Sequence, residues 1–198
     1  MGRPFSFTDS TVTGGVFDGT FSITAPYWER RGTAELPYFH QGVDVGCPMR
    51  TPLYAPYSCT VGYLTRVGDG NALTPIYGNS TWLNVNGGGS FFTAHLDEIS
   101  VNVGDVLAEG DPIGYSGTTG QSTGPHVHLQ CSLGSTEVLV IETVDPLAFM
   151  TMVASRGTTA PAPTLTTKDY ALKIRDYATE GVPSLALVAM LDELAGRL

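Results

Sequence analysis

Four histidines, His40, His95, His126 and His128, are the residues of this chain whose types and spacing could do chemistry. His126 and His128 lie either side of Val127, and side chains two apart on a strand point to the same face. Two imidazoles on one rigid face suit a metal site or an acid–base pair. Histidine is also an ordinary half-buried residue, so this pair alone leaves both interpretations open.

The segment HQGVD places His40 four residues before Asp44. Gly42, Gly46 and Pro48 argue against a helix here. In a fully extended strand the two residues would lie ~13 Å apart, which is too far for ligands with metal bonds of ~2 Å. A bend at Gly42 could bring them together. Taken by itself, the segment favours the alternative, an exposed strand and turn that carry an unrelated histidine and aspartate.

One site could use all four imidazoles together with Asp44. Catalytic Zn²⁺ takes three nitrogen or oxygen ligands from the protein and keeps a fourth position for water, whose pKa falls toward ~7. Spare imidazoles beside such a site can accept a proton or stabilise the oxyanion of a tetrahedral intermediate.

The elements that must position these residues are predicted to be short strands in one β-rich domain. The chain has 198 residues, of which 42% are hydrophobic, 24 are glycine and 13 are proline. This composition indicates a packed core with many turns. We expect loops over 25–36 and 65–81 and a short helix or turn near Met150, with strands over 5–24, 52–56, 59–64, 82–86, 91–96 and 126–130.

Charge and hydropathy exclude several partners. Lys and Arg number 10 against 19 Asp and Glu, a formal net charge of -9, so we expect no nucleic-acid partner. No apolar stretch approaches the ~18 residues that a membrane span requires. The N-terminus has no apolar run of the signal-peptide type, so we expect delivery by a route other than secretion with a signal peptide. The sequence leaves open whether Cys47 and Cys59 form a disulfide.

The composition changes near Arg156. We predict a main domain over 1–155, a Pro/Thr-rich linker over 156–166 and a helical appendage over 167–198, a possible docking element.

Three motifs together resemble the lysostaphin/LytM-type zinc metalloendopeptidases, which are β-rich peptidoglycan hydrolases that cut peptide cross-bridges. They are HQGVD (40–44), TAHL (93–96) and STGPHVHLQ (122–130). The resemblance covers roughly residues 23–149. It implies a mainly β fold, an antiparallel β-sheet metallopeptidase core, with the C-terminal helices as an appendage.

The resemblance also implies roles for individual residues. His40, Asp44 and His128 would be the ligands of Zn²⁺. His95 and His126 would be catalytic, orienting and deprotonating the water and stabilising the transition state. The paired histidines thus receive different roles.

Three further positions bear on the resemblance. Asn79 falls near a Gly-Asn position of the family, where it would be either a substrate contact or only a turn residue. Thr93 stands where the family often has tyrosine, and Gln130 stands where an acidic residue often follows the second histidine. Because an acid would anchor an imidazole more firmly than an amide, Gln130 puts the fine rate and substrate preference in doubt, but not the metal site.

The predicted function is zinc-dependent hydrolysis of peptide cross-bridges in bacterial peptidoglycan. The alternative is a non-cleaving peptidoglycan-binding or structural tail module on the same fold. We expect a phage lysin or a virion-associated tail hydrolase that acts on the bacterial cell envelope, with residues 167–198 as the contact with a virion or tail protein.

Overall fold

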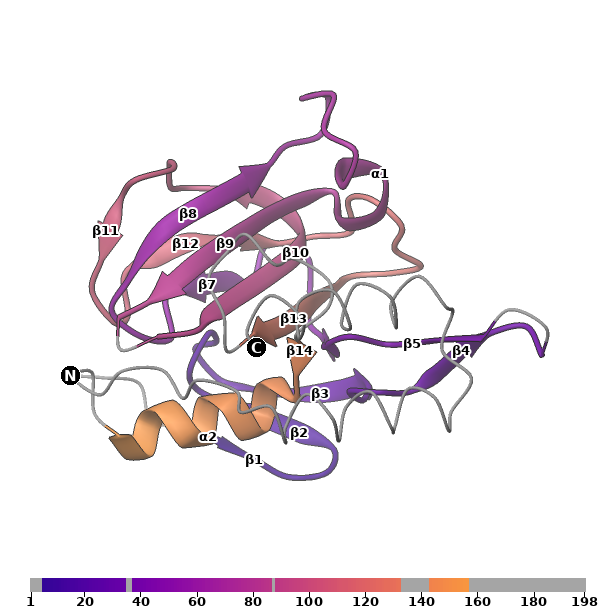
Figure 1. Ribbon diagram of the computed structural model, residues 1–198, viewed down its shortest axis with the longest axis horizontal. Helices are drawn as coiled ribbons and strands as arrows, with labels where there is room; N and C mark the ends of the chain where they lie inside the picture. The colour runs from indigo at the N-terminus through magenta and orange to yellow at the C-terminus, as the bar shows by residue number, and fades with distance from the viewer. Residues whose placement is uncertain (1–4, 35–36, 87, 133–142, 157–198) are drawn as a thin grey trace, which may run out of the picture.

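The computed structural model describes residues 5–34, 37–86, 88–132 and 143–156. Within them the chain is mainly antiparallel β-sheet, as predicted (Figure 1). The elements are, in order, β1 (Ser6–Phe7), β2 (Thr11–Thr13), β3 (Thr20–Ala25), β4 (Arg30–Gly32), β5 (Pro37–Phe39), β6 (Val43–Gly46), β7 (Pro52–Tyr54), β8 (Cys59–Thr65), α1 (Thr74–Tyr77), β9 (Asn79–Val85), β10 (Ser90–Ile99), β11 (Val106–Leu107), β12 (Pro112–Ser116), β13 (His126–Ser132), β14 (Thr143–Val144) and α2 (Pro146–Arg156).

The central path of the main sheet runs β1-β2-β3-β6-β13-β10-β9-β8-β11. Strand β12 pairs with both β10 and β7, and β14 pairs with β13. All the expected strand regions therefore form strands, and a helix begins at Pro146 as the sequence indicated. The predicted appendage over 167–198 lies outside the described residues.

The loops expected over 25–36 and 65–81 are only partly loops, since the first contains β4 and the second contains α1 and the start of β9. Strand β4 pairs antiparallel with β5 as a separate two-stranded ribbon, with Arg30 opposite Phe39 and Gly32 opposite Pro37. The β4 sequence, Arg-Arg-Gly, has no alternation of apolar and polar residues. The ribbon projects at the side of the molecule, so it has no face that must pack on the core (Figure 1). Pairing with β5, and not a hydrophobic pattern, makes it a strand.

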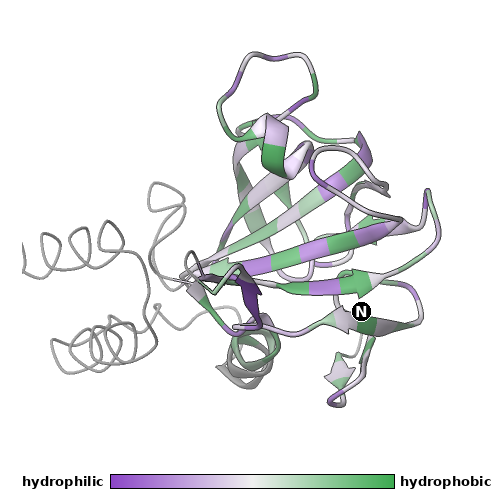
Figure 2. Ribbon diagram, turned by 90° about the vertical axis from the view of Figure 1, so that its right-hand side faces the viewer, coloured by the Kyte–Doolittle hydropathy of each residue, from purple (hydrophilic) through white to green (hydrophobic). Residues whose placement is uncertain are grey.

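The sheet separates its residues by alternation between a core face and a second face. Val43 and Val45 of β6, and Val127 and Leu129 of β13, belong to the main hydrophobic cluster. Residues between them in sequence point to the opposite face, since strand side chains alternate. Bands of apolar and polar colour along the strands in Figure 2 follow this alternation. The polar site residues thus lie on the face of the sheet that is turned away from the main hydrophobic cluster.

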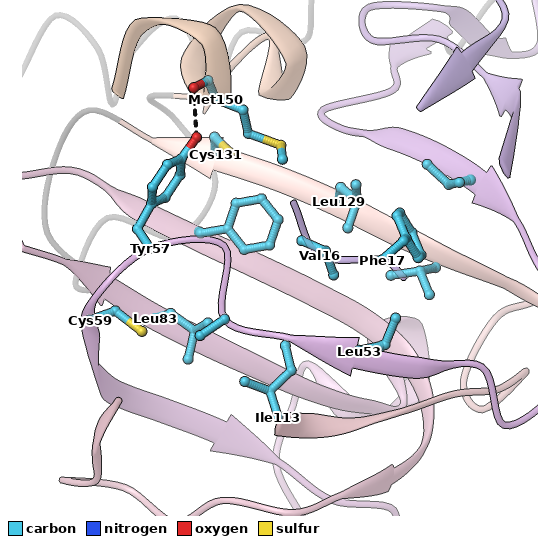
Figure 3. Packing of buried hydrophobic residues seen from close by; sticks show 14 of the residues in the cluster. Val16, Phe17, Leu53, Tyr57, Cys59, Leu83, Ile113, Leu129, Cys131 and Met150 are labelled. Atoms are coloured by element: carbon cyan, nitrogen blue, oxygen red, sulfur yellow. Dashed lines mark hydrogen bonds between the residues drawn. The ribbon is translucent and has the colours of Figure 1, made fainter. Parts of the chain in front are cut away.

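Helix α2 closes part of the core. Leu147, Phe149 and Met150 join the main cluster, and the Tyr57 hydroxyl donates to the Met150 carbonyl at 2.6 Å (Figure 3). Cys131 of β13 lies in the same cluster. All three cysteines are free and buried, so Cys47 and Cys59 do not form a disulfide. None of the described helices combines the length and apolar character needed to cross a bilayer.

Candidate metal centre and its groove

The His126–Val127–His128 stretch opens β13, and its two imidazoles share the second face of the sheet. His128 is the register partner of Asp44 on the neighbouring strand β6, and Val127 is that of Val45. Both histidines line the same groove, whereas Val127 is fully buried in the core. The prediction that the two histidines share one face is confirmed.

His40 and Asp44 also come together. His40 Nε2 lies 3.0 Å from Asp44 Oδ1, and both residues are buried. The segment is therefore not an exposed turn with unrelated polar residues. Gly42 has a clear packing role: a Cβ there would overlap the carbonyl oxygen of Leu129 and the ring of His128. Only glycine lets this segment approach β13 so closely.

Three ligand atoms converge at this point: His40 Nε2, Asp44 Oδ1 and His128 Nδ1. The two imidazole nitrogens are 3.0 Å apart, and Nδ1 of His128 is 2.9 Å from the carboxylate oxygen. Tetrahedral zinc with bonds of about 2.0–2.1 Å holds its ligand atoms roughly 3.3 Å apart. The triangle is therefore close to the size that a zinc ion needs.

The other ring nitrogens fix the state of these two imidazoles. His40 Nδ1 donates to the Pro26 carbonyl at 3.0 Å, and His128 Nε2 donates to Gln130 Oε1 at 3.3 Å. When such an imidazole is neutral it carries a single proton, so its nitrogen facing Asp44 is then the unprotonated one. Burial lowers the pKa of His128, although the carboxylate acts in the opposite direction. The neutral form of His128 is therefore favoured.

Asp44 supplies the third possible ligand atom, the carboxylate oxygen Oδ1. Burial alone would raise the pKa of its carboxyl, but His128 and His40, when their rings are protonated, donate hydrogen bonds that lower this pKa well below the usual range, so Asp44 is a carboxylate. With neutral imidazoles, three acceptors then face one another at hydrogen-bond distance with no proton between them. Such an arrangement is repulsive unless a cation lies among them. The donor set, two imidazoles and a carboxylate, fits zinc.

His95 and His126 lie beside this cluster. Their ring centroids are 4.6 Å apart, and His126 Nε2 is 3.8 Å from Asp44 Oδ1. His126 Nδ1 donates to the Gly124 carbonyl at 2.8 Å, and His95 Nδ1 donates to the Thr119 carbonyl at 2.8 Å. The Nε2 atom of each ring therefore carries the free lone pair that a general base needs.

The backbone at His95 departs from the strand pattern. In β10, Phe91 lies in the main cluster and Phe92 and Ala94 lie on the other face, so simple alternation would turn His95 toward the core. A bulge between Thr93 and Leu96, with φ of +64° at His95, turns the imidazole to the groove instead. Bulges commonly re-aim a side chain in this way next to active sites.

Burial is the main cause that lowers the pKa of His95 to about 4, with smaller contributions from His126 and His128. The hydrogen bond with Thr119 acts in the opposite direction. His95 is therefore neutral at pH 7, as a proton acceptor must be.

The four histidines line a groove of about 1100 Å³. One wall comes from the β4–β5 ribbon and another from α1, which lie at the same side of the molecule in Figure 1. The Gly/Ser/Thr loop that precedes β13 supplies the rim. The lining residues outside the histidines include Trp28, Glu29, Arg31, Tyr38, Phe39, Ile76, Tyr77, Gln121, Thr123 and Pro125.

The Asn79 side chain is occupied by backbone groups. Its Nδ2 donates to the carbonyls of Leu96 and Asp97 at 3.1 and 3.2 Å, and its Oδ1 accepts from the Val67 amide at 2.8 Å. These contacts hold the chain just after His95. A contact of Asn79 with substrate stays a prediction.

The two departures from the family pattern also have structural partners. Thr93 is fully buried and its hydroxyl hydrogen-bonds that of Thr81, 2.7 Å away on β9. Gln130 Oε1 accepts the hydrogen bond of His128 Nε2, as described above. Sequence reasoning did not single out Arg31, whose Nη2 donates to Asp44 Oδ2 at 2.9 Å. An arginine in a segment expected to be a loop carried no signal.

The model of "Peptidase family M23" matches residues 38–139, just over half of the chain. The chain is 30% identical over 115 residues to "Peptidoglycan DD-endopeptidase ShyA" of Vibrio cholerae, a match that covers 55% of this chain and 24% of that protein. The chain spans about a quarter of the length of the curated relatives it matches.

Solved structures match the fold as well. The catalytic domain of the antimicrobial peptidase lysostaphin from Staphylococcus simulans has a TM-score of 0.55 at 29% identity, covering 66% of this chain and 92% of that one. The catalytic domain of the prophage-encoded M23 protein EnpA from Enterococcus faecalis has a TM-score of 0.53 at 28% identity, covering 64% and 88%.

Proposed function

We infer, because this chain belongs to Peptidase family M23, that it is a zinc-dependent endopeptidase that hydrolyses peptide cross-bridges of bacterial peptidoglycan. The observation that carries the proposal is the convergence of three possible ligand atoms, from His40, Asp44 and His128, all within 4.8 Å of one another. The names of ShyA, a peptidoglycan endopeptidase, and of lysostaphin, an antimicrobial peptidase, support the substrate class.

In this proposal His40 Nε2, Asp44 Oδ1 and His128 Nδ1 hold the zinc ion. Zinc bound there would lower the pKa of a water molecule toward ~7 and polarise the carbonyl of the scissile peptide. The carbonyl groups of Pro26 and Gln130 fix the ligating imidazoles in the required tautomer.

The other two histidines move the proton. Nε2 of His126 or His95 accepts it from the attacking water, and the resulting imidazolium then donates to the leaving amine or hydrogen-bonds the oxyanion. The carbonyls of Gly124 and Thr119 keep the opposite nitrogen of each ring protonated, so each ring presents a base to the groove. A positioned proton acceptor of this kind contributes roughly 10²–10⁴ in rate.

The groove suits an extended peptide. It is open to solvent between the β4–β5 ribbon and α1, and aromatic side chains of both walls line it. A peptide lying along it would place one carbonyl over the histidine cluster.

Digestion of purified peptidoglycans of defined cross-bridge type, followed by mass spectrometry of the released fragments, tests the proposal. We expect new peptide termini at one type of cross-bridge, loss of this activity with a chelator, and recovery with zinc. Stoichiometric zinc without cleavage of any peptidoglycan would instead support a non-cleaving binding module on the same fold.

We also propose that the enzyme is a phage lysin or a virion-associated hydrolase, with residues 167–198 as its contact with a virion or tail protein. The prophage origin of the similar EnpA catalytic domain supports this proposal. Residues 157–198 lie outside the described part of the chain. Deleting them is expected to spare peptidase activity and to abolish incorporation into phage particles; unchanged incorporation would remove the proposed contact.

A further inference from the structure

Arg31, on β4, reaches from the groove wall to the candidate metal centre. Its Nη2 donates to Asp44 Oδ2 at 2.9 Å and its Nε donates to Glu29 Oε2 at 3.1 Å. The side chain is only 30% exposed. Arginine stays protonated at all relevant pH values and its planar guanidinium fixes the direction of each hydrogen bond. Two carboxylates therefore hold this group in one place.

The two oxygens of Asp44 consequently have different partners. Oδ1 faces the ligand nitrogens of His40 and His128 at 3.0 and 2.9 Å, whereas Oδ2 faces Arg31. With Oδ2 engaged, the carboxylate can offer only Oδ1 to a cation in the cluster. Without the arginine, Oδ2 would be free to rotate toward the metal or toward water.

A cation beside a metal ion would ordinarily weaken metal binding by repulsion. Glu29 compensates for this effect, because its carboxylate shares the guanidinium and makes the pair nearly neutral. Among the described residues that line the groove, Arg31 is the only lysine or arginine. The ribbon thus supplies the orienting hydrogen bond without leaving an unpaired positive charge next to the site.

We propose that Arg31 is a positioning residue that keeps Asp44 a one-oxygen ligand in the correct orientation and so strengthens zinc binding. The proposal rests on the proposed metal site of this peptidase. Partners of this kind, which contact a ligand and not the metal, typically change metal affinity 10–100-fold when they are removed.

The test compares zinc affinity of the full chain with that of three variants, by competition with a chromophoric chelator. In Arg31→Gln the zinc dissociation constant is expected to rise about tenfold or more. In Arg31→Lys, which keeps the charge but not the planar guanidinium with its paired donors, the dissociation constant is expected to rise less. Arg30→Gln is the matched control, since it makes the same change one residue away on an exposed side chain. It should bind zinc like the wild type.

A spectroscopic measurement separates positioning from a general effect on folding. Cobalt(II) in place of zinc reports coordination number through its visible d–d absorption. We expect weaker, shifted bands in Arg31→Gln and Arg31→Lys, as a second oxygen of Asp44 enters the coordination sphere, and an unchanged spectrum in Arg30→Gln.

The outcomes distinguish the two proposals. If the wild type binds no zinc, the proposed function fails. If the wild type binds zinc and both Arg31 variants match Arg30→Gln in affinity and cobalt spectrum, the role of Arg31 is overturned while the proposed function stands. Should Arg31→Gln fail to fold, the comparison of Arg31→Lys with Arg30→Gln decides.

Discussion

The residues of the histidine cluster stand on two kinds of backbone, regular paired strand and locally irregular chain. Asp44 and His128 are register partners on regular antiparallel strands, so their approach follows from the pairing of β6 with β13. His95 lies at a bulge with a left-handed backbone, and His126 lies where a loop enters β13. Two of the three proposed ligands thus depend on sheet register, whereas the third, His40, lies between β5 and β6. Of the proposed proton acceptors, His126 pairs in register with Gly46 and His95 depends on a local irregularity.

This difference in backbone suits the two tasks of the site, metal binding and proton transfer. A metal site needs three atoms held at fixed separations, and the pairing of β6 with β13 fixes two of them at little cost in strain. A left-handed conformation at a residue other than glycine or asparagine costs roughly 1–2 kcal/mol, and other interactions of the fold must offset this cost. At His95 the hydrogen bonds of Thr119 and Asn79 with the neighbouring backbone help to hold this conformation.

Replacing a ligand on the regular strands should have the largest effect. His128→Ala removes one of three ligand atoms, so we expect loss of stoichiometric zinc and no detectable peptidase activity. Elemental analysis of the purified variant measures the metal. Full zinc occupancy in this variant would show that the metal lies elsewhere.

Replacing the two proposed proton acceptors should separate chemistry from metal binding. His126→Ala and His95→Asn, the latter chosen because asparagine tolerates positive φ, should keep zinc and lose roughly 10²–10⁴ in kcat. Zinc content and single-turnover cleavage of a defined substrate measure the two effects. Normal turnover in either variant would contradict the role given to that histidine.

Acid should destabilise the metal-free protein through His95. Its pKa is about 4 in the folded state and near 6.5 in the unfolded chain, so the unfolded state binds the proton first. Stability is therefore lost as the pH falls from about 6.5 to about 4, by at most about 3 kcal/mol from this group. Urea unfolding across this range should show a shallower pH dependence in His95→Asn; identical slopes would count against a depressed pKa at His95.

Gly42 tests how closely the first motif must approach β13. Gly42→Ala places a methyl group against Leu129 and His128, and we expect a loss of about 1–3 kcal/mol in unfolding free energy together with weaker zinc binding. Gly124→Ala is the control, since a Cβ there meets nothing within 4 Å. Equal stability of the two variants would mean that the segment can shift without cost.

Sequence patterns predicted the site residues on regular strand better than those that depend on close packing or on irregular backbone. The spacing of His126 and His128 indicated a shared strand face because strand periodicity is local. The approach of His40 to Asp44 depends on Gly42 packing against a strand nearly 90 residues later, which spacing alone could not show. The family resemblance supplied that pairing.

Other features had no sequence signal at all. The bulge that turns His95 into the groove contains no glycine, and the carbonyls of Pro26, Thr119 and Gly124 that fix the imidazole tautomers can come from any residue type. Arg31 lies in a ribbon whose strand character comes only from pairing with β5. Contacts made through the backbone are invisible to an argument from residue types.

Anomalous diffraction at the zinc edge, from crystals grown with one equivalent of zinc, tests the central claim most directly. We predict a single strong peak bounded by His40 Nε2, Asp44 Oδ1 and His128 Nδ1, with His95 and His126 outside bonding distance. A peak bound by His95 or His126, or no peak among the three predicted atoms at full zinc occupancy, would contradict the division between ligands and proton acceptors.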